Sequence, residues 1–268
     1  MSESGTKKAV VVEQRGSVLL VTLNRPEARN AVDQAVWVGV GSALAQAEHD
    51  ITIRAVIVTG AGDQSFCAGA DLKALARGER IAPESKEQMS WGFAGIVNHP
   101  ISKPVIAAVN GTALGGGTEI VLACDLVVAA DNATFGLPEV KRGILAGAGG
   151  AFRLVEQLPR KIAMELLLTG DTFDATRALA LGLVNAVVPP GDLIDTALSL
   201  AQRIAANAPL SVQATKRIAL GIKEGAIANE AARWAMNQHE SALVMRSQDA
   251  REGPRAFAEK REPQWKGC

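Results

Sequence analysis

The sequence predicts an α/β fold, and two patterns carry this prediction. Short apolar runs alternate along the chain with segments in which apolar residues recur at helical spacing. Glycine-rich loops follow the ends of several apolar runs, where α/β proteins usually place their binding sites. A chain of 268 residues with 48% hydrophobic content can bury one sizeable core.

The elements are expected in this order. Residues 9–12 and 18–22 are apolar and flank Arg15-Gly16, which predicts a β-hairpin. A helix should follow, because apolar residues recur at helical spacing at Val32, Val36, Val40, Ala43, Leu44 and Ala47. Buried strands are predicted at residues 55–59, 105–109, 126–130 and 183–188.

Two further segments, residues 77–86 and the chain beyond about Pro209, are predicted to form a loop and a helical region. Residues 77–86 are charged and contain Gly78 and Pro83, which predicts a mobile loop beside the site. Beyond about Pro209 the sequence predicts helix to the end, with apolar side chains available for burial. We therefore divide the chain into a core, residues 1–205, and a C-terminal helical region, residues 206–268.

The segment Gly111-Thr-Ala-Leu-Gly-Gly-Gly-Thr-Glu119 is the most informative motif. Three glycines precede a carboxylate and an apolar run that can start a helix, so main-chain N–H groups are left free. Such donors stabilise an oxygen that becomes negative during a reaction. A tight turn would explain the glycines equally well, but Glu119 within an apolar run is costly unless it is paired or used.

A second carboxylate has similar surroundings. Proline precedes it in Phe135-Gly-Leu-Pro-Glu139, and Gly147-Ala-Gly-Gly150 follows. If Glu119 and Glu139 share one pocket, burial and repulsion raise at least one pKa, which makes a proton donor near neutral pH. A solvated surface glutamate is the alternative for Glu139.

A third loop, residues 60–73, follows the predicted strand at 55–59. It would leave main-chain N–H groups free around Ala68 to Ala70. Two donors from separate loops beside two carboxylates describe a site that polarises a carbonyl while protons move next to it.

These motifs resemble those of the crotonase, or enoyl-CoA hydratase/isomerase, superfamily, and the resemblance covers nearly the whole chain. The matching segments are residues 24–31, 66–73, 111–119, 135–139, 147–150 and 257–261. The resemblance implies a spiral of ββα turns rather than a flat doubly wound sheet. It also implies a homotrimer or homohexamer built through the C-terminal region.

Roles follow from the resemblance residue by residue. The N–H groups of Ala70 and Gly116 would form the oxyanion hole, Glu119 and Glu139 would be the catalytic carboxylates, and Gly147 would help to hold the water. Positions implied to contact the acyl-CoA are Arg25, Ala28, Ala68, Asp71, Leu72, Lys73, Leu114, Pro138, Phe257 and Lys260, with Lys260 reaching the CoA of a neighbouring subunit.

The implied reaction is the addition of water to a 2-trans-enoyl-CoA. Glu119 would activate water toward C3 and Glu139 would deliver a proton to C2, with no metal and no cofactor beyond the CoA of the substrate.

Isomerases of this superfamily commonly lack the carboxylate that matches Glu119. Many members also carry proline where this chain has Ala146, so the identity of the substrate stays open.

Other classes of function have less support. Lys plus Arg equals Asp plus Glu at 28 each, so no overall field attracts nucleic acid or an anionic membrane. Residues 1–9 lack the apolar core of a secretory signal, and no apolar run is long enough to span a bilayer. Cys67, Cys124 and Cys268 show no zinc or disulfide spacing, so we expect a cytoplasmic protein without a metal site.

Two alternatives to an enoyl-CoA hydratase stay open. One is an isomerase, or a dehydratase of a functionalised acyl-CoA, on the same fold. The other is a protein that binds acyl-CoA or associates with RNA without catalysis, although the intact carboxylates and glycine loops speak against it.

Overall fold

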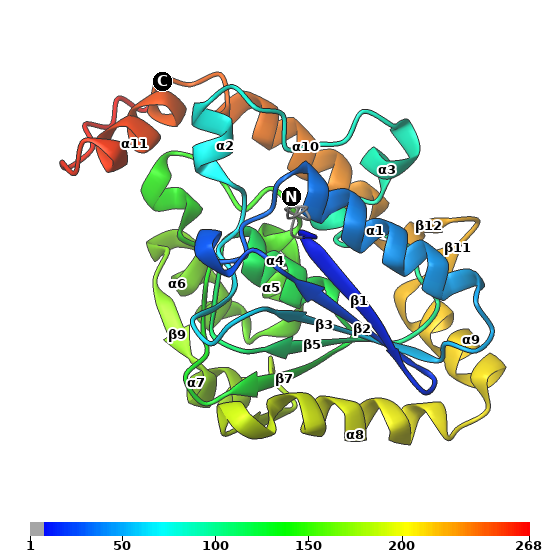
Figure 1. The fold of residues 1–268 in the computed structure, drawn as a ribbon. Helices are drawn as coiled ribbons and strands as arrows, with labels where there is room; N and C mark the ends of the chain where they lie inside the picture. Colours follow the sequence, from blue (N-terminus) through cyan, green and yellow to red (C-terminus); the bar gives the residue numbers. More distant parts are fainter. Residues whose placement is uncertain (1–7) are drawn as a thin grey trace, which may run out of the picture.

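The computed structural model describes residues 8–268 and has an α/β architecture, with a six-stranded sheet, a four-stranded sheet, a short two-stranded hairpin and helices around them (Figure 1). The fold class predicted from the sequence is confirmed. Most of the segment for which we expect no secretory signal, residues 1–7, lies outside the described residues.

The larger sheet has six strands in the order β1-β2-β3-β5-β7-β10. They are β1 (Val10–Arg15), β2 (Val18–Leu23), β3 (Ala55–Gly60), β5 (Val105–Val109), β7 (Leu126–Ala130) and β10 (Ala186–Val188). The pair β1–β2 is the predicted hairpin, and the other neighbours pair in parallel.

One strand is shorter than predicted. The expected strand at 183–188 begins only at Ala186, because Leu183 donates its N–H to Ala178 at the end of helix α7 (Ala175–Ala180). Gly182, at φ 82°, makes the turn between them.

The smaller sheet consists of β4 (Ser65–Cys67), β6 (Thr112–Leu114), β8 (Thr134–Gly136) and β9 (Thr172–Asp174). These strands are not among the predicted elements, because each is only three residues long. Strands β3, β5 and β7 of the large sheet each lead directly into β4, β6 and β8 of the small one. Helices α2 (Leu72–Ala76) and α4 (Gly116–Ala123) follow the first two pairs, which makes the expected spiral of ββα turns.

The core lies on both faces of the larger sheet. Alternate residues such as Val56 and Val58 face a cluster that includes helix α1 (Gln34–His49), whereas Ala55 and Ile57 face helix α8 (Leu193–Ala205). Both faces are apolar because parallel strands are covered on both sides. Figure 1 shows α8 lying along one side of the sheet and α1 on the other.

Shorter helices complete the core. The loop predicted at residues 77–86 is observed over residues 77–85, because its last residue, Lys86, is already the first residue of helix α3 (Lys86–Ser90). A 3-10 turn, η2 (Phe93–Gly95), packs on α1. Helices α5 (Gly150–Gln157) and α6 (Arg160–Thr169) lie between β8 and β9 along the chain.

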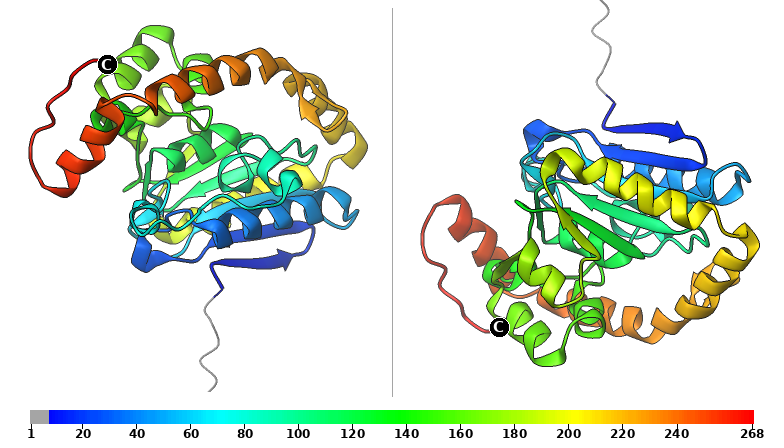
Figure 2. Two further views of the ribbon diagram at one scale, coloured as in Figure 1. Left: turned by 90° about the horizontal axis from the view of Figure 1, so that it is seen from above. Right: turned by 90° about the horizontal axis from the view of Figure 1, so that it is seen from below.

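The C-terminal region runs around the core as an arc (Figure 2). It contains α9 (Pro209–Leu220), α10 (Ala231–Val244) and α11 (Asp249–Ala258). The prediction of helix to the end is wrong in three places. A short hairpin, β11 (Ile222–Lys223) with β12 (Ala226–Ile227), interrupts it, because Glu224 and Gly225 both adopt positive φ. Residues 245–248 form a turn between α10 and α11, and residues 259–268 are not helical.

Apolar side chains of this region remain exposed. Met236, Leu243 and Met245 are 69%, 52% and 62% exposed. Within residues 8–268, no helix combines the length and the apolar character needed to cross a bilayer.

Candidate active site

The three glycines at 115–117 allow neighbouring segments to approach the start of α4 closely. Gly115 has φ 55°, which turns the chain out of β6. A Cβ on Gly116 would clash with the ring of Phe93, and a Cβ on Gly117 would clash with the carbonyl oxygen of Cys67 at the end of β4. Close approach therefore requires glycine at both positions.

The N–H groups of Ala70 and Gly116 are placed near each other. Val32 donates to the oxygen of Gly69 and accepts from the N–H of Asp71, so the N–H of Ala70, between them, points to the other side. The backbone of Gly69 packs on Gly116, since a Cβ on Gly69 would lie 3.1 Å from the nitrogen of Gly116. As the first residue of α4, Gly116 has no intrahelical acceptor for its N–H.

Glu119 lies in the first turn of α4 and is only 4% exposed. Its Oε1 accepts hydrogen bonds from the N–H groups of Ala148 at 2.7 Å and Gly150 at 2.9 Å. Gly150 is the first residue of α5, so the carboxylate lies at a helix N-terminus. A side chain on Gly150 would come within 2.9 Å of Oε1, which explains the glycine there.

Glu139 lies on the 3-10 turn η3 (Pro138–Arg142), after β8. Its Oε1 packs against Gly115, where an added Cβ would be 3.0 Å away. Its Oε2 is buried and finds no hydrogen-bond partner among residues 8–268. The Oε2 atom of Glu139 is therefore enclosed, but no hydrogen bond within residues 8–268 fixes its position.

A hydrogen-bond bridge fixes the two carboxylate-bearing segments relative to each other. The Thr118 hydroxyl donates toward two main-chain oxygens, that of Ala113 at 2.7 Å and that of Gly136 at 2.9 Å. It also accepts a hydrogen bond from the N–H of Gly136. Gly115 also donates to the oxygen of Gly136. Since Gly136 ends β8, the start of α4 is bonded to the strand that leads to Glu139.

Both carboxyl groups have raised pKa values. Burial raises the pKa of Glu119 to about 8, and the negative charge of Glu139 acts in the same direction, while the N–H groups of Gly150 and Ala148 and the charge of Arg153 oppose it. Burial raises the pKa of Glu139 to about 7. A buried pair that repels can hold one proton near neutral pH, as acid–base chemistry requires.

The loop around Gly147 contacts both Glu119 and the C-terminal helix α10. The N–H groups that reach Glu119 are those of Ala148 and Gly150, whereas the oxygen of Gly147 accepts from the side chain of Asn237 at 2.7 Å. The role of Gly147 in holding water stays a prediction. Asn237 is not among the site residues predicted from the sequence, where only the helical spacing of polar residues in α10 pointed to it.

Six of the predicted acyl-CoA contacts form one rim beside Ala70. They are Arg25, Ala28, Ala68, Asp71, Leu72 and Lys73, from the turn η1 (Pro26–Ala28), the loop after β4 and α2. Asp71 accepts from the N–H of Ala74 and pairs with Arg25 at 2.9 Å, so both have structural partners. Leu72 and Lys73 are exposed.

The remaining predicted contacts lie in two places. Leu114 ends β6 beside Gly69, and Pro138 begins η3, so both adjoin the carboxylates. Phe257 and Lys260 lie instead with Lys141 and Arg142 around a separate cavity of about 560 Å³, where the Arg142 guanidinium covers the Phe257 ring. Within one chain, these two residues do not join the rim.

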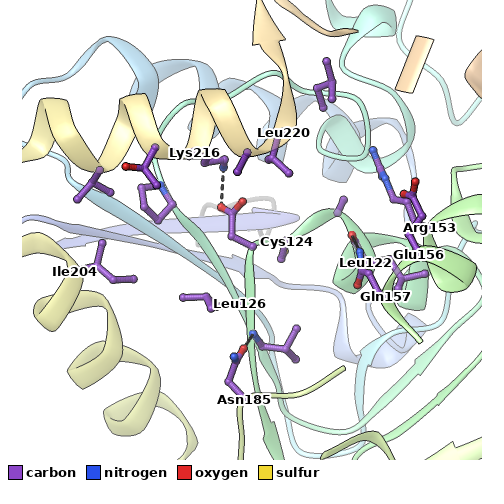
Figure 3. Close-up of a pocket in the computed structure, with 18 of the residues that line it drawn as sticks. Leu122, Cys124, Leu126, Arg153, Glu156, Gln157, Asn185, Ile204, Lys216 and Leu220 are labelled. Atoms are coloured by element: carbon purple, nitrogen blue, oxygen red, sulfur yellow. Dashed lines mark hydrogen bonds and ion pairs between the residues drawn. The ribbon is translucent and has the colours of Figure 1, made fainter. Parts of the chain in front are cut away.

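A larger cavity of about 910 Å³ lies apart from the two carboxylates (Figure 3). It is bordered by Leu122 and Cys124 at the end of α4, by Lys216 of α9 and by Arg153 of α5. Neither Glu119 nor Glu139 lines it. Across residues 8–268, no cluster of three or more His, Cys, Asp or Glu is arranged to hold a metal ion.

Comparison with known proteins agrees with this geometry. The family model described as enoyl-CoA hydratase/isomerase matches residues 13–268. The carnitinyl-CoA dehydratase of Proteus mirabilis strain HI4320 is 45% identical over 259 residues, covering 94% of this chain and 96% of that protein. That of Escherichia coli K12 is 45% identical over 258 residues, covering 95% and 97%.

Solved structures resemble the chain over almost its whole length. A structure described as carnitinyl-CoA hydratase from Mycobacterium avium is 58% identical with a TM-score of 0.95, covering 98% of this chain and 100% of that one. An enoyl-CoA hydratase from Mycobacterium tuberculosis H37Rv is 47% identical with a TM-score of 0.75 and the same coverage. The chain therefore belongs to the enoyl-CoA hydratase/isomerase family, the crotonase superfamily.

Proposed function

We propose that this enzyme interconverts a 3-hydroxyacyl-CoA and its 2-enoyl-CoA, and that its acyl group carries a cationic substituent, as in carnitinyl-CoA. The observation that carries the first part is the pair of carboxylates beside the N–H groups of Ala70 and Gly116. Glu119 is buried, and Glu139 is partly buried with its Oε2 enclosed. The relatives named carnitinyl-CoA dehydratase support the second part, and they favour this alternative over a hydratase for plain enoyl-CoA.

The thioester oxygen would lie between the N–H groups of Ala70 and Gly116. These donors stabilise the negative charge that the oxygen gains when C2 loses or receives a proton. Removing one such donor typically costs about 10² to 10³ in rate. Because they are main-chain groups on packed segments, no reorganisation is needed during the reaction.

In dehydration, ionised Glu139 would take the proton from C2, and the electron pair would move toward the thioester carbonyl. Protonated Glu119 would then give its proton to the C3 hydroxyl, which leaves as water while the C2=C3 bond forms. Hydration reverses these steps, with Glu119 accepting a proton from the attacking water. The raised pKa values of both carboxyls match these alternating states.

The charge of the site favours a cationic acyl group. Arg153, whose charge acts on Glu119, is already paired with Glu230, and Oε2 of Glu139 finds no partner within residues 8–268. A quaternary ammonium two bonds from C3 would reduce the repulsion between the carboxylates. The Phe93 ring, packed on Gly116, adds an aromatic surface suited to such a cation.

The test compares carnitinyl-CoA with its neutral isostere, 3-hydroxy-5,5-dimethylhexanoyl-CoA, in which carbon replaces the quaternary nitrogen. We expect kcat/KM to be at least 10-fold higher for the cation, which corresponds to about 1.4 kcal/mol. 3-Hydroxybutyryl-CoA serves as the small neutral control. Equal or higher kcat/KM for a neutral substrate would contradict the cationic substrate, and no dehydration of any of the three would contradict the reaction.

We also propose self-association through residues 206–268, as a homotrimer or homohexamer. The exposed apolar side chains Leu210, Ile218, Met236 and Met245 support it, because such surface is normally covered. The 560 Å³ cavity with Phe257 and Lys260 would then face a neighbouring subunit's CoA. Sedimentation velocity at micromolar concentration should give a trimer or hexamer, and a monomer would contradict the proposal.

A further inference from the structure

One face of α10 lies against the loop that supplies the hydrogen bonds to Glu119. Its side chains are Trp234, Asn237 and Ser241, together with that of Glu230, the N-cap residue of α10, and we call these four the inner face of α10. Steps of four, three and four residues place them on a single side of the helix. Asn237 is the only buried residue of α10, whereas its neighbour Gln238 is exposed.

Asn237 acts on the Ala148 N–H, the first of the two donors to Glu119, through the peptide group that joins Gly147 to Ala148. Its Nδ2 donates to the oxygen of Gly147 at 2.7 Å, and the N–H of Ala148 donates to Oε1 of Glu119, also at 2.7 Å. That oxygen and that N–H belong to the same planar peptide unit. The bond from Asn237 therefore fixes the orientation of the plane and polarises the N–H toward Glu119.

Ser241 packs on the same segment. A Cβ on Gly147 would lie 3.1 Å from its Oγ, and this hydroxyl is buried without a hydrogen-bond partner among residues 8–268. Two successive turns of α10 thus contact Gly147, the residue before the donor Ala148, through Asn237 and Ser241.

The second donor to Glu119, the N–H of Gly150, is held in place through Arg153 and Glu230. The Nε and Nη2 of Arg153 donate to the two oxygens of Glu230 at 2.8 and 2.6 Å, and Nε1 of Trp234 donates to the same carboxylate at 3.0 Å. The Arg153 side chain and the Trp234 ring both pack against Gly149, which directly precedes the donor Gly150. Arg153 is 4% exposed, whereas Glu230 and Trp234 are partly buried.

We infer that the inner face of α10 is a positioning device, which holds the loop at residues 146–150 and, through the N–H groups of Ala148 and Gly150, the Glu119 carboxylate. This inference rests on the proposed function, because it assigns Glu119 a proton-transfer role. It links the C-terminal region to the chemistry without direct contact with the substrate.

Two substitutions should then act in opposite directions. The charged groups that act on Glu119 are Glu139 from η3 and Arg153 from α5, and Glu230 partly neutralises Arg153. Asn237→Ala loosens the Ala148 donor, so the pKa of Glu119 should rise. Glu230→Gln leaves the charge of Arg153 without its counterion, so the pKa of Glu119 should fall.

The experiment measures kcat and KM against pH for both variants, with Gln238→Ala as the matched control on the outer side of α10. We expect Asn237→Ala to lower kcat about 10- to 100-fold, the cost of misplacing a catalytic group by about 1 Å. KM should stay within about 2-fold, and the limb of the profile that belongs to Glu119 should move up in pH. For Glu230→Gln the limb should move down, and Gln238→Ala should match the parent.

Infrared difference spectroscopy gives a readout that needs no turnover. The C=O stretch of protonated Glu119, assigned by its loss in Glu119→Gln, is titrated in the parent and in both variants. Shifts in opposite directions support the inference, whereas unchanged or parallel shifts overturn it. Glu230→Gln keeps the shape of its cluster, so its shift decides the question if Asn237→Ala does not fold. A parent protein inactive on every thioester would refute the proposed function alone, because this titration would still be readable.

Discussion

The surroundings of Glu119 and Glu139 differ in how firmly each carboxylate is held. Glu119 accepts two main-chain hydrogen bonds at the N-terminus of α5 and is 4% exposed. Glu139 lies on a short 3-10 turn, and one of its buried oxygens finds no partner in the described chain. A fixed carboxylate suits a reaction with an oxygen at C3, whereas a less constrained one suits the transfer of a proton to and from C2.

The largest expected effects come from Glu119→Gln and Glu139→Gln. Each should lower hydration and dehydration about 10²- to 10⁴-fold, the usual contribution of acid–base catalysis. Exchange of the C2 hydrogen of the hydroxyacyl thioester with deuterium oxide should persist in Glu119→Gln and disappear in Glu139→Gln. NMR measures this exchange, and the reverse pattern would interchange the two roles.

A smaller effect should follow from crowding the better-held carboxylate. In Gly150→Ala, the new Cβ would come within 2.9 Å of Oε1 of Glu119, so the carboxylate must move. We expect kcat to fall about 10- to 100-fold with little change in KM. Gly191→Ala is the control, because its Cβ would meet nothing within 4 Å. A Gly150→Ala enzyme with the parent kcat would show that the position of Glu119 is not critical.

The raised pKa values also predict how stability depends on pH. Both carboxyls bind a proton more tightly in the folded than in the unfolded state, where the pKa is 4.5. Below about pH 4.5 they are protonated in both states and have no effect on stability, and as pH rises from there toward 8 they increasingly destabilise the fold.

Removing either charge should therefore stabilise the protein at pH 8.5. Urea denaturation should show Glu119→Gln and Glu139→Gln to be more stable than the parent by at least about 1.4 kcal/mol, the value of one pKa unit. The difference should shrink toward pH 4.5. A gain that is independent of pH would mean that charge burial is not the cause.

The smallest effect is expected at the rim, away from both carboxylates. Lys73 is exposed on α2, so Lys73→Ala should raise KM about 2- to 5-fold, as for a surface charge of up to about 1 kcal/mol, and leave kcat unchanged. Raising the salt concentration should reduce the difference, because exposed charges are screened. A fall in kcat at Lys73→Ala would show that the rim takes part in the chemistry.

Much of this architecture could be predicted from the sequence. The strands β3, β5 and β7 and helix α1 follow from local apolar patterns, and Glu119 was conspicuous because a carboxylate stood within an apolar run. The strands β4, β6 and β8 were missed, since three residues show no measurable alternation. They exist because long-range pairing, which no local pattern records, satisfies their main-chain groups.

The sequence by itself determined the α/β class, the glycine loops and the two carboxylates, because periodicity and glycine act within a few residues of the chain. Only the tertiary structure decided that Ala148 and Gly150 hold Glu119, that Oε2 of Glu139 finds no partner within residues 8–268, and that Asn237 lies behind the loop. Asn237 and Gly147 are 90 residues apart. The raised pKa values likewise depend on burial, which is a property of the packed fold and of no single segment.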